Sequence, residues 1–220
     1  MSAFYSAVRF VVADGTRLAY RVTVEGEEHV PATGAAILAP SHRSMMDIPF
    51  LAIVTHRRIR FMGKSSAFNV PVLGSLFSAL GSFPVERDGS DFGPVRTSLA
   101  LLAEGELLAV YPEGTRQHGP TIQPLQPGAA YLSLRSGAPI VPIGLAGTEE
   151  ILRHGRGRLP RFGRGAVVAG PPIVPPARAT RAVPRAMVDE LSEQLHGALQ
   201  SVFDRANALR AGDQGLNTTP

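Results

Sequence analysis

His42 and Asp47 have the residue types and spacing of a general base and its orienting carboxylate. An imidazole accepts a proton near neutral pH, and a carboxylate on its second ring nitrogen selects the tautomer and stabilises the imidazolium. A helix that begins between the two residues would fold the carboxylate back toward the ring. Ser44 and Asp47 also form a capping-box-like pattern, which would only stabilise the start of that helix. The segment therefore predicts either a catalytic pair or a helix cap.

The second segment with chemistry is the sequence YPEGTR, residues 111–116. Gly114 allows backbone N–H groups to approach an anion closely. The planar guanidinium of Arg116 fits a phosphate with two hydrogen bonds. Glu113 would orient a hydroxyl or hold Arg116. The alternative is an ordinary surface turn with a solvated Glu–Arg pair, a contact that contributes little.

Both segments follow short apolar runs that are typical of buried strands. Strands are predicted over residues 21–25, 35–39, 60–63, 107–111, 139–145 and 166–169, and helices over 44–54, 70–80, 95–104, 129–135 and 182–209. This alternation predicts an α/β fold with a mostly parallel central sheet flanked by helices. Ligands of such sheets bind beyond the carboxyl ends of the strands, where both segments are expected.

The chain is expected to form one domain over residues 1–212, followed by a flexible tail over 213–220. Residues 1–20 carry apolar side chains near helical spacing, at Phe4, Val8, Val11, Val12, Leu18 and Ala19. This predicts an N-terminal amphipathic helix that either lies in a membrane interface or packs on the protein's own core. A long helix is expected at the C-terminal end.

Composition excludes several classes of protein. Hydrophobic residues make up 44% of the 220 residues and charged residues 18%, which excludes a disordered chain. The absence of cysteine excludes disulfides, zinc–thiolate sites and cysteine nucleophiles. The six histidines are scattered, so no metal site is predicted.

No membrane span and no secretory signal are predicted. The longest charge-free stretch, residues 65–85, is interrupted by prolines and glycines, unlike a transmembrane helix. Arg9 interrupts the apolar residues of the N-terminus, unlike a signal peptide.

Taken together, the two segments resemble the glycerolipid acyltransferase family, which includes 1-acylglycerol-3-phosphate acyltransferase. Two weaker blocks agree with this family in order, so the resemblance extends from Val22 to Gly147. In chain order the four blocks are His42-x4-Asp47, residues 60–64 with 85–87, residues 112–116, and residues 140–143. Many relatives have an acidic residue where this chain has Ser65 and Ser66, and a serine where it has Gln117. These departures leave the acceptor open.

The resemblance implies a role for each matching residue. His42 would deprotonate a glycerol hydroxyl, which then attacks an acyl thioester, and Asp47 would orient His42. Pro142 would shape the floor of the site near the acyl donor. The implied acceptor-binding residues are Lys64, Arg87, Glu113, Gly114, Thr115 and Arg116. The resemblance implies no metal, no cofactor and no covalent enzyme intermediate; acyl-CoA or acyl carrier protein would be the co-substrate.

The expected reaction is acylation of 1-acylglycerol-3-phosphate to phosphatidic acid. The alternative acceptors are glycerol-3-phosphate and another lysophospholipid. A catalytically silent lipid-binding module is the alternative from a different class.

A basic stretch lies between residues 151 and 188, with eight arginines and no acidic residue. We expect it to dock on an anionic membrane surface, on the phosphates of coenzyme A or on an acidic carrier protein, unless it is only a solvated loop. Nucleic acid is not expected as a partner, because Phe162 is the one aromatic residue available there for base stacking. The expected location is cytoplasmic, peripherally bound to the inner face of the cell membrane.

Overall fold

A central sheet organises the chain in the computed structural model, which describes residues 8–64, 81–85, 93–153, 159–177 and 182–215. Within these residues the sheet has seven strands in the order β1-β7-β6-β2-β5-β3-β4. The strands are β1 (Thr23–Glu25), β2 (Ala36–Pro40), β3 (Ile59–Lys64), β4 (Phe83–Val85), β5 (Leu107–Ala109), β6 (Ile140–Ala146) and β7 (Ala166–Ala169). All neighbouring strands are parallel except β6 and β7. The predicted α/β class with a mostly parallel sheet is confirmed.

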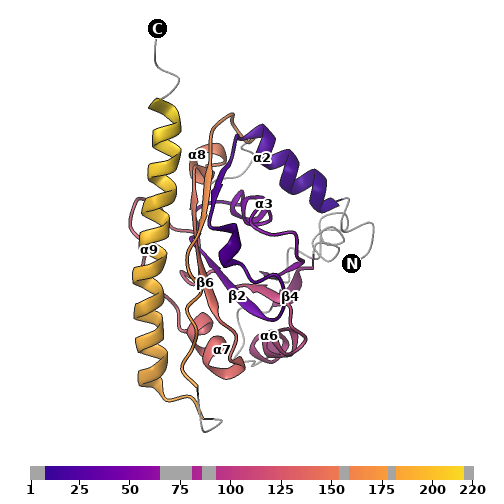
Figure 1. Cartoon of the computed structure of the whole chain (residues 1–220), viewed down its shortest axis with the longest axis vertical. Helices are drawn as coiled ribbons and strands as arrows, with labels where there is room; N and C mark the ends of the chain where they lie inside the picture. The colour runs from indigo at the N-terminus through magenta and orange to yellow at the C-terminus, as the bar shows by residue number, and fades with distance from the viewer. Residues whose placement is uncertain (1–7, 65–80, 86–92, 154–158, 178–181, 216–220) are drawn as a thin grey trace.

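Helices cover both faces of this sheet (Figure 1). They are η1 (Phe10–Asp14), α2 (Gly15–Ala19), η2 (Glu27–His29), α3 (Asp47–Leu51), α6 (Gly93–Ala103), α7 (Gly128–Ser136), α8 (Thr148–Ile151) and α9 (Arg185–Gly215). In Figure 1 the long helix α9 runs along one side of the sheet, while α2 and α3 lie on the other. The predicted long C-terminal helix is confirmed.

Alternate residues of the buried strands contribute to hydrophobic clusters on the two faces of the sheet. Leu38 of β2 packs toward α3 together with Phe50, whereas Ile37 packs toward α6, α7 and α9. All five residues of β2 are buried, as expected for a central parallel strand covered on both faces. This buried strand ends at Pro40, directly before the segment that contains His42.

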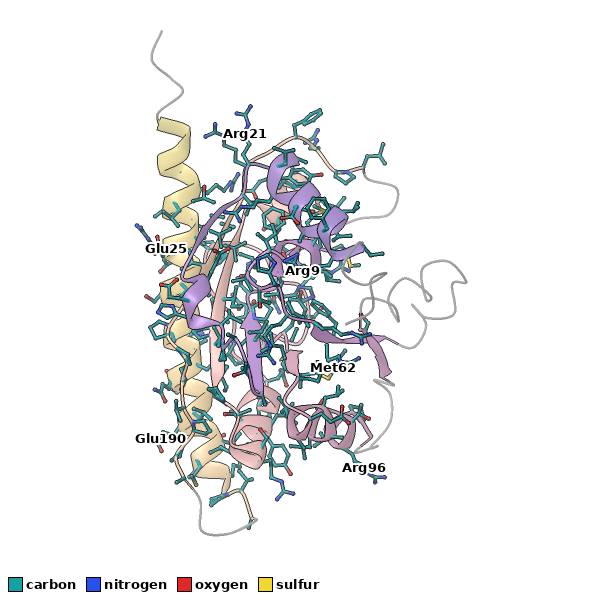
Figure 2. All side chains as sticks on the ribbon, turned by 45° about the vertical axis from the view of Figure 1, so that its right-hand side comes forward. Arg9, Arg21, Glu25, Met62, Arg96 and Glu190 are labelled. Atoms are coloured by element: carbon teal, nitrogen blue, oxygen red, sulfur yellow. The ribbon has the colours of Figure 1, made fainter. Side chains whose placement is uncertain are left out.

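Helix α9 packs directly on the backbone of β6 at Gly144. A Cβ atom at this position would lie 2.2 Å from the carbonyl oxygen of Val202, so only glycine fits. At the outer strand β1, the carboxylate of Glu25 receives the guanidinium of Arg205, with Nη2 to Oε2 at 2.8 Å. Figure 2 shows Glu25 beside α9. These contacts hold α9 against the sheet.

Several boundaries differ from the prediction. Helix α3 is shorter than residues 44–54, because residues 41–46 form a loop whose amides bond to Asp47. Strand β4 and helix α8 were not predicted. Helix α9 extends to Gly215, past the expected start of the tail at 213, and residues 216–220 lie outside the described residues. The helix expected over 70–80 lies outside them too.

The N-terminal helix covers residues 8–19 of the described chain, but its predicted apolar face is not the buried one. Ala13 and Arg9 are buried, whereas Val11 and Leu18 are 70% and 83% exposed. The side chain of Arg9 reaches the body of the protein, where Nη2 lies 2.8 Å from Nδ1 of His56. The prediction that this apolar face packs on the protein's own core is therefore wrong for Val11 and Leu18. Among the described residues, no helix is both long enough and apolar enough to span a bilayer.

Candidate active site

His42 lies in the loop that leaves the carboxyl end of β2. Ser41 continues the pairing of β2 with β6: its amide donates to the carbonyl of Ile143 (2.9 Å), and its Oγ accepts the amide of Leu145 (3.0 Å). The chain then turns away from the sheet, so His42 stands at the strand edge where α/β proteins bind ligands. Its side chain is 18% exposed.

The structure brings His42 and Asp47 together. Nδ1 of His42 lies 2.8 Å from Oδ2 of Asp47, whose side chain is fully buried. Since a carboxylate only accepts hydrogen bonds, Nδ1 carries the ring proton. In the neutral ring, this tautomer makes Nε2 the nitrogen that can accept a proton.

Asp47 also organises the loop around His42. Its Oδ2 accepts the amides of Arg43 (2.7 Å) and Ser44 (2.9 Å). The bond to the Ser44 amide is one half of the capping box that the sequence suggested. The other half is missing, because Oγ of Ser44 donates to the carbonyl of Leu152 (2.8 Å) and accepts the amide of Met46. One carboxylate therefore serves both the loop and the imidazole.

Glu113 locks the second segment onto the first. Its side chain is fully buried and forms an ion pair with Arg43, with Nη1 at 2.8 Å from Oε1 and 3.0 Å from Oε2. It also accepts the amides of His42 and Gln123, both at 3.0 Å. The expectation that Glu113 contacts the acceptor or holds Arg116 is therefore wrong in this structure. The carboxylate is enclosed and its partner is Arg43.

Arg43 is a site residue that the sequence analysis missed. Its Nη1 donates to the carbonyl of His42 (3.0 Å) and its Nη2 to that of Thr121 (3.2 Å). The guanidinium lies 4.8 Å above the ring of Phe203 on α9. Arg43 thereby joins the His42 loop, residues 113–123 and α9. Its place directly after His42 was the only available signal.

The turn that follows Glu113 lies beside His42. The amide of Gln117 donates to the carbonyl of His42 (2.8 Å), and the amide of Gly114 donates to that of Tyr111 (3.1 Å). Gly114 has a φ of +73°, and a Cβ there would lie 3.0 Å from Cγ of Gln126, so glycine is required. The turn therefore brings Arg116 next to the His42 loop.

Arg116 and Thr115 remain available to a ligand. Thr115 is exposed and Arg116 is partly exposed. Within the described part of the chain, the guanidinium of Arg116 makes no hydrogen bond or ion pair. A partly enclosed cation of this kind is suited to an anionic ligand.

The remaining predicted residues are Lys64, Arg87 and Pro142. Lys64 ends β3, where it pairs with Val85 of β4, and Arg87 lies outside the described residues. Pro142 is buried within β6, opposite Ala39 of β2, and its carbonyl accepts the amide of Gly170 (2.9 Å). Pro142 therefore packs inside the sheet, and its role in shaping the floor of the site near the acyl donor stays a prediction.

Tyr111 is the second residue that the sequence analysis missed. Its ring lies against the imidazole of His42, with ring centroids 4.1 Å apart and an interplanar angle of 32°. Burial raises the pKa of the Tyr111 phenol well above its usual range, and the negative charge of Asp47 raises it further. The phenol therefore keeps its proton. Its position directly before Pro112 gave no indication of this contact.

Residues 21–146, more than half of the chain, match the model of a protein family described as Acyltransferase. A chloroplastic 1-acyl-sn-glycerol-3-phosphate acyltransferase of Brassica napus, BAT2, is 27% identical over 157 residues, which are 70% of this chain and 45% of that protein. The 1-acyl-sn-glycerol-3-phosphate acyltransferase of Bacillus subtilis is 29% identical over 142 residues, which are 63% of this chain and 70% of that protein. The matched region is thus less than half the length of the Brassica protein.

The fold is also similar to a solved structure. The crystal structure of the 1-acyl-sn-glycerophosphate acyltransferase PlsC from Thermotoga maritima matches with a TM-score of 0.73 and 20% sequence identity. The match covers 91% of this chain and 80% of the Thermotoga chain. At this identity the comparison shows a shared fold.

Proposed function

The chain belongs to the acyltransferase family, and on this premise we propose that it acylates the free hydroxyl of 1-acylglycerol-3-phosphate, giving phosphatidic acid. The acyl donor is a thioester of coenzyme A or of acyl carrier protein. The observation that carries this proposal is the hydrogen bond between Nδ1 of His42 and Asp47, in a loop whose backbone is bonded to the end of the Arg116 turn.

The proposed chemistry uses His42 first as a base and then as an acid. Nε2 accepts the proton of the glycerol hydroxyl as its oxygen attacks the thioester carbonyl carbon. The tetrahedral intermediate collapses, the carbon–sulfur bond breaks, and the thiolate takes the proton from the imidazolium. The products are an ester and a free thiol. Asp47 stabilises the imidazolium between the two steps.

The proposed acceptor site is the turn of residues 114–116. The amides of Gly114 and Gln117 are already bonded to carbonyls, so the ligand-binding groups here are the side chains of Thr115 and Arg116. Arg116 would bind the acceptor's phosphate with its planar fork. We retain Lys64 and Arg87 as proposed phosphate ligands, because the resemblance assigns basic residues there.

Two alternatives remain distinct from this proposal. Glycerol-3-phosphate or another lysophospholipid would use the same base and the same guanidinium. A silent lipid-binding module would need neither an unprotonated Nε2 nor its buried carboxylate, so the geometry around His42 favours an enzyme.

An acceptor panel tests the proposed function. Purified full-length protein is mixed with one acyl-CoA and, in separate reactions, with 1-acylglycerol-3-phosphate, glycerol-3-phosphate and neutral or zwitterionic lysophospholipids. Release of free thiol is recorded. We expect the fastest release with 1-acylglycerol-3-phosphate. No release with any acceptor would contradict the enzyme, and a faster rate with another acceptor would change the substrate.

We also propose that the edge of the sheet that carries the active site docks on an anionic membrane surface. Leu18 is 83% exposed, Leu159 is 85% exposed and Phe162 is fully exposed. The amide of Gly165 donates to the carbonyl of Tyr20 (3.2 Å), which fastens the segment after Phe162 to the end of the N-terminal helix. The exposed apolar side chains therefore come from two distant segments whose backbones meet, and Leu159 and Phe162 belong to the basic stretch.

The variant Leu159→Asp/Phe162→Asp is expected to bind phosphatidylglycerol vesicles about tenfold or more weakly, because it loses two apolar side chains that would enter the interface. Sedimentation with the vesicles measures this. The control is Val174→Asp: Val174 is 73% exposed but follows Ile173, which pairs with Ile140 at the opposite edge of the sheet. Equal binding by the double variant and the wild type would contradict this docking surface.

A further inference from the structure

The ring of Tyr111 is packed between the active site and the core. One face lies against His42, with 4.1 Å between the ring centroids. The ring also packs against the hydrophobic cluster that includes Ala109 and Phe61. A side chain fixed on both sides limits the orientations that the imidazole can adopt.

Two buried oxygen atoms near His42 have no hydrogen-bond partner among the described residues. They are the hydroxyl of Tyr111 and Oδ1 of Asp47. Oδ2 of the same carboxylate accepts three hydrogen bonds, from His42, Arg43 and Ser44. Buried polar atoms almost always have a partner, so each of these two oxygens requires one.

A donor and an acceptor are thus left without partners on the two side chains that contact the imidazole of His42. The negative charge of Asp47 acts on the phenol, and the phenol keeps its proton because burial and this charge both raise its pKa. A protonated phenol donates and a carboxylate oxygen accepts. Buried water commonly links such groups when they do not meet directly.

We propose that Tyr111 is a positioning residue for the general base, with its ring holding the face of His42 and its hydroxyl donating to Oδ1 of Asp47 through one buried water. The inference rests on the proposed role of His42. Among the described residues, the charged and titratable groups around His42 are Asp47 on α3, Tyr111 after β5, the Arg43–Glu113 pair and Arg116 in the neighbouring turn. The proposed bond gives the hydroxyl of Tyr111 its missing hydrogen-bond partner.

This arrangement has a definite effect on proton affinity. A donor at Oδ1 withdraws negative charge from Asp47 and so weakens its hold on the imidazolium. Removing the hydroxyl while keeping the ring should therefore raise the pH at which His42 titrates. A residue that only fills space would leave this midpoint unchanged.

The test is an NMR titration of the His42 ring in the full-length protein. Tyr111→Phe is expected to move the midpoint to higher pH by about half a unit. Site-specific 3-fluorotyrosine at position 111, a stronger donor, should move it to lower pH. The control is Tyr131→Phe, which removes a phenol from the groove between α7 and α9, where no effect on His42 is expected. Thermal unfolding establishes that each protein is folded.

Activity provides the second readout. Tyr111→Phe should lower kcat several-fold with the KM for the acceptor unchanged, and the acid limb of the pH profile should move with the NMR midpoint. Tyr111→Leu, which also loses the ring contact, should lower kcat further. Identical His42 titrations in Tyr111→Phe and wild type would overturn the proposal. A shifted titration in a protein that acylates no acceptor would support the role of Tyr111 while the proposed function fails.

Discussion

His42→Ala is expected to lower kcat for thiol release by about 10²–10⁴-fold, the contribution of a well-placed general base. The imidazole is already oriented by Asp47 at 2.8 Å, so alanine removes the proposed proton acceptor. Binding of the acceptor should be retained, because the proposed phosphate ligand, Arg116, is unchanged. Rates at saturating acyl-CoA and acceptor, together with acceptor binding by calorimetry, measure the two effects separately.

The control for this variant is His29→Ala. His29 is remote from the site, in the turn before β2, and its Nδ1 lies 2.8 Å from the carbonyl of Ala169. This control shows whether the loss of an imidazole that bonds to the backbone away from the site is enough to lower the rate of thiol release. Unchanged thiol release by His42→Ala, in a preparation free of the wild-type enzyme, would remove His42 from the mechanism.

The second large effect is expected from Glu113→Gln. This substitution keeps the size of the side chain but leaves the guanidinium of Arg43 buried without a counter-charge. Breaking one side of a buried ion pair costs about 3–5 kcal/mol of unfolding free energy. For a chain of this length, that corresponds to a fall in the midpoint of thermal unfolding of about 6–20 °C. Urea unfolding at neutral pH provides the free energy.

Two further variants isolate the buried pair. Adding Arg43→Met to Glu113→Gln should recover part of the lost stability, because the unpaired buried charge is then removed. Glu25→Gln is the matched control, since it removes the same charge from the exposed pair with Arg205 and should change the midpoint little. A midpoint of Glu113→Gln equal to that of Glu25→Gln would mean that the Arg43–Glu113 pair does not fasten the two loops.

The His42 and Glu113 variants test different contacts of the His42 loop. The backbone of His42 donates to Glu113 and accepts from Arg43 and Gln117. These bonds fix the loop, while Asp47 and the ring of Tyr111 fix the imidazole. Loss of Glu113 should therefore reduce stability and kcat together, whereas loss of the imidazole should reduce kcat alone.

The order of strands and helices followed directly from patterns in the sequence. Continuous apolar runs at residues 35–39, 107–111 and 139–145 predicted strands covered on both faces, and β2, β5 and β6 lie there. Strand β4 was missed because Pro84 interrupts a run of only three residues, and helix α8 because four residues form little more than one helical turn.

The residues for the chemistry were also apparent in the linear chain, since His42 and Arg116 lie in loops directly after predicted strands and Asp47 begins the helix that follows the first of these loops. Their partners were not, because partners are chosen by contacts between segments far apart in the sequence. Arg43 and Glu113 are 70 positions apart. Their side chains are buried together because residues 112–127 fold back over the His42 loop. Local spacing thus determined where the functional groups leave the sheet. Packing between distant segments determined that Glu113 turns inward onto Arg43, that Tyr111 lies on the imidazole, and that Arg116 remains open to a ligand.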